Sequence, residues 1–456
     1  MPQETSRTNI PRSSEVILIE ESLTFEEVVV VVEKFIPNST TALKLVLAVG
    51  LSAHTSIAVM LWLVIVSPPS SGKSDLVRLI KHAPSTYSLD TFTQNSFISG
   101  ERVRGNEKVY DLLNELDKKV LIIKDWTPLF SMDEKATRKI IGDLVGIYDK
   151  EFSKFSGSRG LISTKSIFSH LGAITPATLS KHTQYLNTVG PRFLFYTLPD
   201  ISSTEEEAGF VSIFSGRDRE ALEHTAQLHA SSYLHQLTQK KDIDVDIPSH
   251  VRQYIEIAAK FLSRCRGITI PNSVVYRDNS GYERKDWEYG DAQIEQPWRA
   301  TLQLIELAKN LAIVSGKSIV GRDELSIVRG VVLSSMPFDR AKAVRAFSEH
   351  GGVLDKNILS SYYAKSQKTM YRLLKELSHL GIAEESKNSG SQPSTYKVVD
   401  TFYNFLVLDA ADFLSNNYKL GGSLVNTDIT PIDELNEEQQ LQVVQSVFGE
   451  ESKWSE

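Results

Sequence analysis

LWLVIVSPPSSGKSDL, residues 61–76, is the stretch that decides the fold of this chain. Its first six residues are aliphatic or aromatic, with no polar residue among them, which is typical of a central parallel strand buried on both faces. A loop of small residues, 67–74, follows, and residues 75–80 have the pattern of a helix. A buried strand, a loop ending in Gly-Lys-Ser and a helix are together the parts of a phosphate-binding P-loop.

In a P-loop, backbone N–H groups and the positive end of the helix bind phosphate groups. Lys73 would neutralise the β- and γ-phosphates of ATP, and the Ser74 hydroxyl would ligate Mg²⁺. The motif usually begins with glycine, whereas Ser67 stands there. The alternative is a surface turn that contains Gly-Lys-Ser by chance, but the flanking strand and helix favour a nucleotide site. The residues expected to bind ATP are Ser67, Ser70, Ser71, Gly72, Lys73, Ser74 and Asp75.

The composition is that of a soluble globular protein with a large core. A chain of 456 residues predicts two or three domains, and 41% hydrophobic and 23% charged residues are ordinary values for such proteins. A single cysteine, Cys265, excludes a disulfide framework within the chain and suits a reducing compartment. The polar first twenty residues do not have the pattern of a signal peptide, so a cytoplasmic location is expected.

Residues 42–66 are apolar enough to be mistaken for a membrane span. They include Lys44, Ser52 and His54, however, and lead directly into the P-loop. We therefore expect a helix over residues 41–53, a short polar turn and the buried strand, with no membrane segment.

The net charge of −7 does not by itself indicate a nucleic-acid partner. Residues 427–456 contain eight acidic residues and one lysine, which accounts for the whole net charge. DNA binding is therefore not excluded, provided that basic residues gather on one surface. The acidic tail is expected to be solvated, with one helix at residues 437–448.

Residues 118–127, KKVLIIKDWT, form a second short aliphatic run, which ends at Asp125. After a P-loop this is the Walker B pattern, in which the carboxylate holds Mg²⁺ beside Ser74; the alternative is an aspartate that caps the next turn. Trp126 stands where a catalytic glutamate usually follows. The nearest other carboxylates that could orient the attacking water are Glu134, Asp149 and Glu151. The remaining possibility is slow hydrolysis.

The next elements are an amphipathic helix at residues 132–148 and an alternating segment, 152–161, that turns at Gly and Ser. The alternation predicts a hairpin whose basic residues, Lys154, Arg159 and Lys165, are available to solvent.

Two more buried strands follow. The strand at residues 168–175 ends at Thr175, which either contacts the γ-phosphate or its attacking water, or only terminates the strand before a proline. The strand at residues 190–196 opens with Arg192 at the expected edge of the sheet. Arg192 is either an arginine finger for the nucleotide of a neighbouring subunit or a solvated side chain.

Outside the core, residues 1–20 are expected to be a loose arm, and residues 25–35, FEEVVVVVEKF, fit a strand or a helix. Residues 205–239, 250–265, 298–312 and 323–333 are predicted helices of a lid, and residues 275–297 a polar loop. The helix at residues 298–312 has an apolar stripe of Leu304, Leu307, Ala308 and Leu311 and a polar face of Arg299, Gln303, Glu306 and Asn310.

Residues 338–399 predict a winged helix-turn-helix. Helices at residues 340–349 and 356–363 precede one at 366–381, with Ser366 as its N-cap and Gly381 at its end. A strand-turn-strand wing around residues 387–391 follows. The third helix would enter a DNA major groove with Gln367, Lys368, Tyr371, Arg372 and Lys375, while Met370, Leu373, Leu374, Leu377 and Leu380 face a core. The alternative is a winged helix used only for protein contacts.

This order of parts resembles the AAA+ helicases related to the minichromosome maintenance (MCM) family, in particular the MCM-like ATPases of bacterial mobile elements. The resemblance covers roughly residues 41–400. It rests on the P-loop, the Walker B strand, the hairpin before Thr175, the Pro191-Arg192-Phe193 sequence and Arg299 at the start of the helix at residues 298–312.

The resemblance implies an α/β fold with an AAA+ core, a helical lid and a C-terminal winged helix, assembled as an ATP-driven hexameric ring on DNA. Lys73 and Ser74 would bind phosphate and Mg²⁺, and Asp125 would bind Mg²⁺. Thr175 would be sensor one, Arg192 the finger acting in trans and Arg299 the second sensor. The hairpin around Lys154 and Arg159 would point into the pore.

The domains predicted in this way are an N-terminal arm (1–40), the nucleotide-binding core (41–200), a helical lid (201–336), a winged helix-turn-helix (337–400) and a C-terminal helix and acidic tail (401–456). The first functional hypothesis is an ATP-dependent DNA helicase or translocase in replication of a mobile element. The second is an ATP-switched DNA-binding initiator or regulator with weak hydrolysis. The third is an inactive structural ATPase homologue in a defence or partition assembly.

Overall fold

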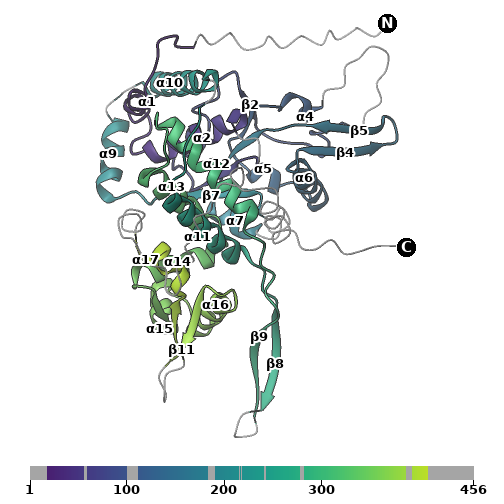
Figure 1. Ribbon diagram of the computed structural model, residues 1–456, viewed down its shortest axis with the longest axis vertical. Helices are drawn as coiled ribbons and strands as arrows, with labels where there is room; N and C mark the ends of the chain where they lie inside the picture. The colour runs from purple at the N-terminus through teal and green to yellow at the C-terminus, as the bar shows by residue number, and fades with distance from the viewer. Residues whose placement is uncertain are drawn as a thin grey trace, which may run out of the picture. The chain divides into compact units, whose positions relative to one another are not determined.

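The computed structural model describes residues 18–55, 59–99, 111–182, 191–214, 216, 218–240, 243–277, 282–386 and 393–408 (Figure 1). The chain divides into one compact unit, Met1–Asn416, and a second, Asn417–Glu456, which lies outside the described residues. Most of the predicted arm and the helix predicted at residues 437–448 lie outside them as well. The predicted boundaries near residues 40, 200 and 336 stay predictions.

A five-stranded parallel sheet lies at the centre of the first unit, as the aliphatic runs predict. Its order is β2 (Thr86–Leu89), β3 (Val120–Ile123), β6 (Ser169–Ile174), β1 (Trp62–Val66) and β7 (Phe193–Thr197). All neighbouring pairs are parallel, and β1, β3 and β6 are buried along their whole length. All five strands therefore end at one side of the sheet, the carboxyl end, and start at the other, the amino end. This mixed α/β architecture is compatible with a P-loop core.

The apolar segment before β1 is a core helix. In α2 (Thr40–Thr55) every residue from 42 to 53 is buried, and the helix packs against β6, α10 (Arg219–Gln239) and α12 (Trp298–Val314) (Figure 1). Its one buried charge, Lys44, is 2.8 Å from the Glu324 carboxylate of α13 (Arg322–Ser334). Among the described residues, none of the helices combines the length and the apolarity needed to cross a bilayer.

The valine-rich segment that fits either a strand or a helix is helix α1 (Phe25–Val32). A capping box decides the matter, because the Thr24 hydroxyl accepts from the Glu27 N–H while the Glu27 carboxylate accepts from the Thr24 N–H at 2.8 Å. Val28 and Val32 are fully buried and face α10. Local capping and packing thus override the strand preference of valine.

The remaining helices of the core are α3 (Lys73–Val77), α4 (Leu112–Glu115), α5 (Thr127–Phe130), α6 (Glu134–Ile147), α7 (Pro176–Lys181), α9 (Ser203–Phe214) and α11 (Ser249–Arg266). The polar face predicted for α12 is partly wrong, since Gln303 and Asn310 are both fully buried. Gln303 donates to Tyr148 Oη, and Asn310 bonds to the Thr55 hydroxyl. Both residues satisfy distant partners that a helical pattern cannot reveal.

Two hairpins extend from the core (Figure 1). The predicted one is β4 (Glu151–Ser156) with β5 (Gly160–Lys165). The second, β8 (Pro271–Arg277) with β9 (Glu283–Tyr289), occupies much of the segment predicted as a polar loop, so that prediction is wrong. Its many charged residues hide the strand pattern, because a hairpin with both faces polar lacks the alternation that marks a half-buried strand.

The C-terminal part of the first unit contains α14 (Phe338–Glu349), β10 (Val353–Asp355), α15 (Lys356–Tyr363), α16 (Gln367–His379), β11 (Ala383–Ser386), β12 (Thr395–Val398) and α17 (Asp400–Val407). Its sheet has the order β10-β12-β11. Ser366 caps α16, and Gly381 follows it with φ +66°, as predicted. The five residues predicted to face a core from α16 are buried.

One buried arginine joins this part to the nucleotide core. Arg340 of α14 donates to the carbonyl oxygens of Cys265 and Gly267, at 2.7 and 2.6 Å, at the end of α11. Its other nitrogen is 2.6 Å from the Glu376 carboxylate of α16. A single guanidinium therefore links three helices.

Candidate nucleotide-binding site

The loop of residues 67–74 leaves the carboxyl end of β1 and leads into α3. Gly72, the N-cap of α3, has φ +79°, a left-handed conformation that favours glycine. Space is not the reason, because the nearest atom to an added Cβ would be Ile36 Cγ2 at 3.9 Å. Ser67 does not have a positive φ, so the serine that replaces the usual first glycine fits without strain. Its hydroxyl bonds to that of Ser71.

Lys73 and Ser74 lie where the loop becomes helix. The Lys73 side chain is buried, and its Nζ donates to the Pro68 carbonyl across the loop at 3.3 Å. The Ser74 hydroxyl donates to the Lys124 carbonyl at 3.1 Å. Since Lys124 directly precedes Asp125, this bond brings the P-loop serine and the Walker B aspartate together, as the sequence predicts.

The strand register places Thr175 between these two groups. β6 lies between β1 and β3, with Ile174 opposite Val66 and Gly172 opposite Ile123. Thr175 is the N-cap of α7, and its hydroxyl accepts from the Thr178 N–H at 3.3 Å. Asp125 also caps, because its Oδ1 accepts from the Thr127 N–H at 2.8 Å. Both capping alternatives are thus present, and the nucleotide roles stay predictions.

These donors fit Mg²⁺-ATP. Lys73 and Ser74 lie at the start of α3, and the Ser74 hydroxyl bonds to the carbonyl of Lys124, the residue before Asp125. Mg²⁺ usually takes one or two protein oxygens and completes its shell with phosphate oxygens and water. Ser74 and Asp125 would hold the metal, and Lys73 and the loop N–H groups the phosphates.

Trp126, at the sequence position where a catalytic glutamate usually follows, is buried. Its indole N–H donates to His170 Nε2 at 3.1 Å, and His170 Nδ1 lies 2.9 Å from the Leu121 carbonyl, to which it donates in the matching tautomer. Burial lowers the pKa of His170 to about 3, so the ring is neutral. A Cβ on Gly172 would collide with the indole, so Trp126 and Gly172 require each other. Nothing in the local sequence predicts this wedge.

The three carboxylates proposed as alternatives lie in two different places. Tyr148 Oη donates to the Met60 carbonyl at 2.8 Å, which places the end of α6 at the amino end of β1. Asp149 and Glu151 follow it and are therefore remote from the P-loop of their own chain. Glu134 starts α6 and pairs with Arg138.

Three arginines gather around Tyr148; we call Arg192, Arg266 and Arg299 the arginine cluster. The guanidinium carbons of Arg192 and Arg299 are 5.7 and 5.8 Å from the Tyr148 ring centroid. Arg266 donates to the carbonyls of Phe193 and Ser335, at 2.8 and 2.9 Å. Burial lowers the pKa of Arg192, and the nearby Arg299 lowers it further, while Asp149, at 3.7 Å, opposes this.

The arginine cluster lies at the amino end of the sheet. Phe193 pairs with Trp62 in β1, so Arg192 is level with the start of that strand. The P-loop begins after Val66, four residues later, about 13 Å along the strand. The resemblance implies that Arg192 is a finger acting in trans and Arg299 a second sensor. The structure brings these two arginines together, but not with residues 67–74 of their own chain.

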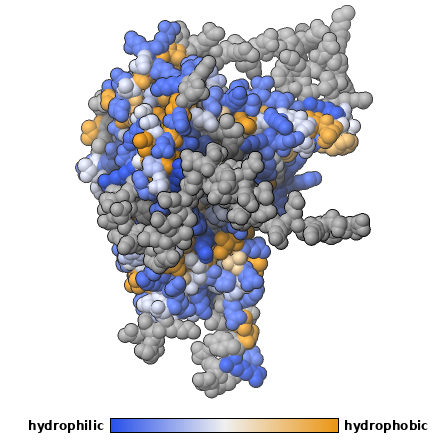
Figure 2. Space-filling view, viewed as in Figure 1, coloured by the Kyte–Doolittle hydropathy of each residue, from blue (hydrophilic) through white to orange (hydrophobic). Residues whose placement is uncertain are grey.

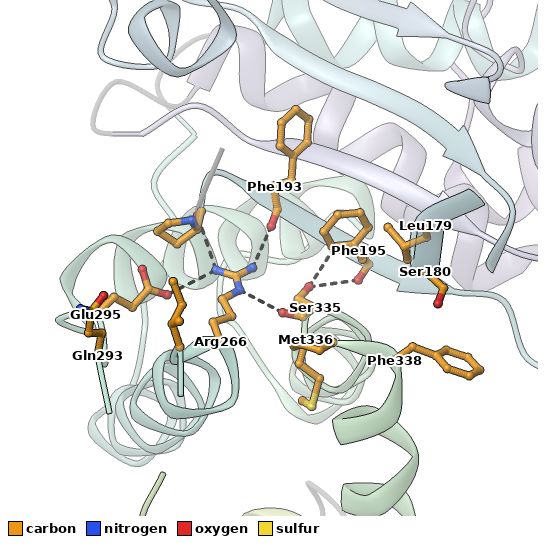
Figure 3. A pocket seen from close by; sticks show the side chains of 13 residues that line it. Leu179, Ser180, Phe193, Phe195, Arg266, Gln293, Glu295, Ser335, Met336 and Phe338 are labelled. Carbon is orange, nitrogen blue, oxygen red and sulfur yellow. Dashed lines mark hydrogen bonds and ion pairs between the residues drawn. The ribbon is translucent and has the colours of Figure 1, made fainter. Parts of the chain in front are cut away.

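A cavity of about 230 Å³ lies beside the arginine cluster; we call it the β7 pocket. Figure 3 shows Arg266 beside Glu295, Phe193 and Ser335 in its wall. Phe193 and Phe195 of β7 and Met336 supply apolar surface, and the Ser335 hydroxyl accepts from the Phe195 N–H at 2.8 Å. Further lining residues are Leu179, Ser180, Pro191, Ile268, Gln293, Pro337 and Phe338. Sequence reasoning missed this pocket because it joins five separate segments of the chain.

Of the three hairpin residues predicted to be available to solvent, Lys165 is exposed, whereas Lys154 and Arg159 are half-buried, which corrects the expectation for those two. Arg159 makes two bonds to the Asp111 carboxylate, at 3.0 and 2.9 Å, and Lys154 Nζ donates to the Ile98 carbonyl at 3.1 Å. The hairpin tip instead exposes an apolar cross-strand pair, Phe155 and Leu161, visible as an orange patch at the upper right of Figure 2. Their DNA contact stays a prediction.

Of the five α16 residues predicted to face DNA, Gln367 and Lys368 are exposed, whereas Tyr371, Arg372 and Lys375 are half-buried. The β9 strand explains the difference. Tyr289 donates to the Arg372 carbonyl at 3.1 Å, and its ring stacks on His379. The N-terminal half of α16, with Lys356 of α15, lines an open groove.

Comparison with known proteins gave no match to any family model and no curated protein of similar sequence.

Proposed function

We propose that this protein is an MCM-like AAA+ ATPase that works as a ring of identical subunits to move along or unwind DNA, in replication of a mobile genetic element. The observation that carries the proposal is the contact between Ser74 and the carbonyl preceding Asp125, beside a left-handed Gly72 and a buried Lys73. A parallel sheet that gathers these groups at its carboxyl end supports nucleotide binding.

In this proposal, Lys73 leaves the Pro68 carbonyl and binds the β- and γ-phosphate oxygens. Ser74 and Asp125 hold Mg²⁺, which neutralises the charge on the phosphates. Thr175, at the end of the strand between them, positions the γ-phosphate or the attacking water.

The arginine cluster supports a ring. Because Arg192 and Arg299 lie together at the amino end of the sheet, they serve the nucleotide of a neighbouring copy rather than their own. An arginine supplied in this way stabilises the charge of the transition state and is typically worth 10³ to 10⁵ in rate.

DNA is the proposed partner of α16. Three helices followed by a small antiparallel sheet are the components of a winged helix, in which the N-terminal residues of the third helix contact base edges. Gln367 and Lys368 are the exposed residues at that end.

Lys73→Ala tests the nucleotide site. We expect at least a hundredfold loss of affinity for a fluorescent ATP analogue, with an unchanged circular dichroism spectrum. Lys260→Ala, which removes an exposed lysine of α11, is the matched control and should bind normally. Unaltered binding by Lys73→Ala would refute the assignment.

Lys368→Ala tests the DNA contact. Loss of one phosphate contact should reduce the slope of log affinity against log salt by about one. Lys356→Ala then tests whether DNA uses the groove beside α15. The double variant Arg372→Ala, Lys375→Ala tests whether DNA uses the half-buried part of α16. If no α16 variant changes the slope, this helix does not bind DNA.

The buried Trp126 favours a second candidate, an ATP-switched DNA-binding initiator or regulator with weak hydrolysis. No carboxylate follows Asp125 directly, so the attacking water lacks its usual base there. Single-turnover hydrolysis and strand-separation assays on the same preparation distinguish the two. DNA binding that depends on ATP, with no unwinding and turnover near the uncatalysed rate, would support the second candidate.

A further inference from the structure

Helix α9 presents an apolar face that its own chain leaves uncovered. Phe210, Val211 and Phe214 are 54, 70 and 84% exposed. Glu206, Phe210 and Phe214 follow at intervals of four residues, so they share one face of the helix. Figure 2 shows orange surface at the left of the view, where Figure 1 places α9. The face is acidic at its start and aromatic at its end.

This helix borders the P-loop. Glu205 in its first turn accepts from the Asn38 amide, and Ile36, two residues before Asn38, is the nearest neighbour of a Cβ added to Gly72. At the other end of α9, the chain enters α10 with Arg219, whose guanidinium lies 3.1 Å from the Asp75 carboxylate of α3. Both ends of α9 are thereby tied to the nucleotide side of the molecule.

The β7 pocket has the size and the charge to receive this face. A dry cavity of about 150 Å³ accepts a benzene molecule, so about 230 Å³ holds one phenyl ring. Lys181 is exposed next to Ser180 at the rim, and Lys342 Nζ lies 5.2 Å from the Phe338 ring. The rim carboxylates Glu295 and Asp149 face Arg266 and Arg192, and Asp339 faces Lys365.

We propose that copies of this chain join head to tail, with Phe214 of one copy in the β7 pocket of the next and Glu206 and Glu207 beside its rim lysines. The proposal rests on the proposed function and names the surfaces that build the ring. α9 follows the carboxyl end of β7, whereas the β7 pocket is lined by Phe193 and Phe195 of that strand and by Arg266 of α11, so the two surfaces use different residues. Interfaces of this heterologous kind form rings or filaments rather than closed dimers.

The same contact completes the nucleotide site. α9 borders the P-loop, and Arg266 lines the pocket as a member of the arginine cluster. Seating α9 in the pocket therefore brings the arginines of the second copy toward the phosphates of the first. The partner copy supplies what the carboxyl end of one sheet lacks.

Cysteine cross-linking of the full chain tests the proposal. The only natural cysteine, Cys265, is fully buried, so engineered cysteines can be read without interference. Phe214→Cys and Ser180→Cys are prepared separately and mixed with a non-hydrolysable ATP analogue under mild oxidation. A disulfide needs Cα atoms within about 7 Å, so the mixture should form a covalent dimer that neither variant forms alone. One chain carrying both substitutions should form a ladder of oligomers.

Leu161→Cys replaces Ser180→Cys in the control mixture, because it is exposed but lies on the β4–β5 hairpin. Phe214→Asp is a second variant; at this exposed position the fold is retained, and assembly measured by mass photometry should weaken at least tenfold. Any one of three results would overturn the proposal. These are cross-linking of Phe214→Cys to itself, a yield of covalent dimer in the control mixture equal to that with Ser180→Cys, and normal assembly of Phe214→Asp. If Lys73→Ala loses ATP while these outcomes occur, only the interface is wrong; if Lys73→Ala keeps ATP, the nucleotide site itself is wrong.

Discussion

The two ends of the central sheet differ in the charged groups that they carry. At the carboxyl end, small polar residues of a loop surround one lysine and one aspartate, with hydroxyl groups free to exchange partners. At the amino end, three arginines pack around the ring of Tyr148, and backbone carbonyls hold one of them firmly. In the proposed function, the first end would receive a phosphate and a metal, and the second would present positive charge.

This difference explains why, in the proposed function, neither end of one sheet would by itself have all the groups needed to hydrolyse ATP. Guanidinium groups keep their charge even where burial lowers their pKa, and they tolerate low-dielectric surroundings when carbonyls and an aromatic ring contact them. At the amino end, ion pairs join Asp149 to Arg192 and Glu295 to Arg266. In the proposed function, about the length of β1 would separate these arginines from a nucleotide bound by the same chain.

The largest effect is expected from Arg192→Ala. If the amino end acts on a neighbour, steady-state ATP hydrolysis should fall about 10³-fold, while ATP affinity changes less than about twofold. Mixing Arg192→Ala with Lys73→Ala subunits should restore part of the activity, because some interfaces then have both residues. Arg138→Ala, an exposed arginine of α6, should hydrolyse normally. A mixture as inactive as its parents would place both ends of the sheet in separate functions.

The strand between the two ends predicts a pH effect. His170 binds a proton in the unfolded chain below about pH 6.5 but in the folded protein only near pH 3. Between these values the unfolded state binds more protons, so the free energy of unfolding falls as pH falls, by about 2 kcal/mol from pH 6.5 to 5. Urea unfolding at pH 7 and 5 measures this loss. His170→Asn should reduce the loss, whereas exposed His250→Asn should leave it unchanged.

Tyr148→Phe should have the smallest effect. It removes the hydroxyl that links the Met60 carbonyl to Gln303 and should lower the free energy of unfolding by about 1 kcal/mol. The ring stays, so the arginines keep their aromatic contact and hydrolysis should change less than about threefold. Thermal unfolding beside Tyr87→Phe provides the comparison. A large loss of hydrolysis would mean that the hydroxyl, rather than the ring, positions the arginines.

Sequence predicts the carboxyl end far better than the amino end. The P-loop, the Walker B strand and Thr175 each sit in a local pattern, and the parallel sheet brings them together without further information. The arginine cluster depends instead on where α6 ends and α12 begins relative to β7. The buried Gln303, which contacts both Tyr148 and Arg192, looks like a solvent-facing residue in any helical pattern.

Two other differences have the same cause. Arg159 is paired because Asp111 comes from a segment 48 residues earlier, a distance over which hairpin alternation carries no information. The charged residues of the β8–β9 hairpin mask its strand pattern. Sequence reasoning therefore predicted neither the hairpin nor its contacts with α16. Local signals can still identify an element correctly. The capping box of Thr24 and Glu27 indicates that residues 25–32 form a helix, although valine prefers strands.

Arg340 has a mechanical consequence. The Arg340 guanidinium is anchored on both sides, to the carbonyls of Cys265 and Gly267 and to the Glu376 carboxylate, and so links the end of α11 directly to α16. In the proposed function, a tilt of α11 during the ATPase cycle would be transmitted through Arg340 to α16 as a rotation. The size of that rotation would be set by how far α11 itself can turn.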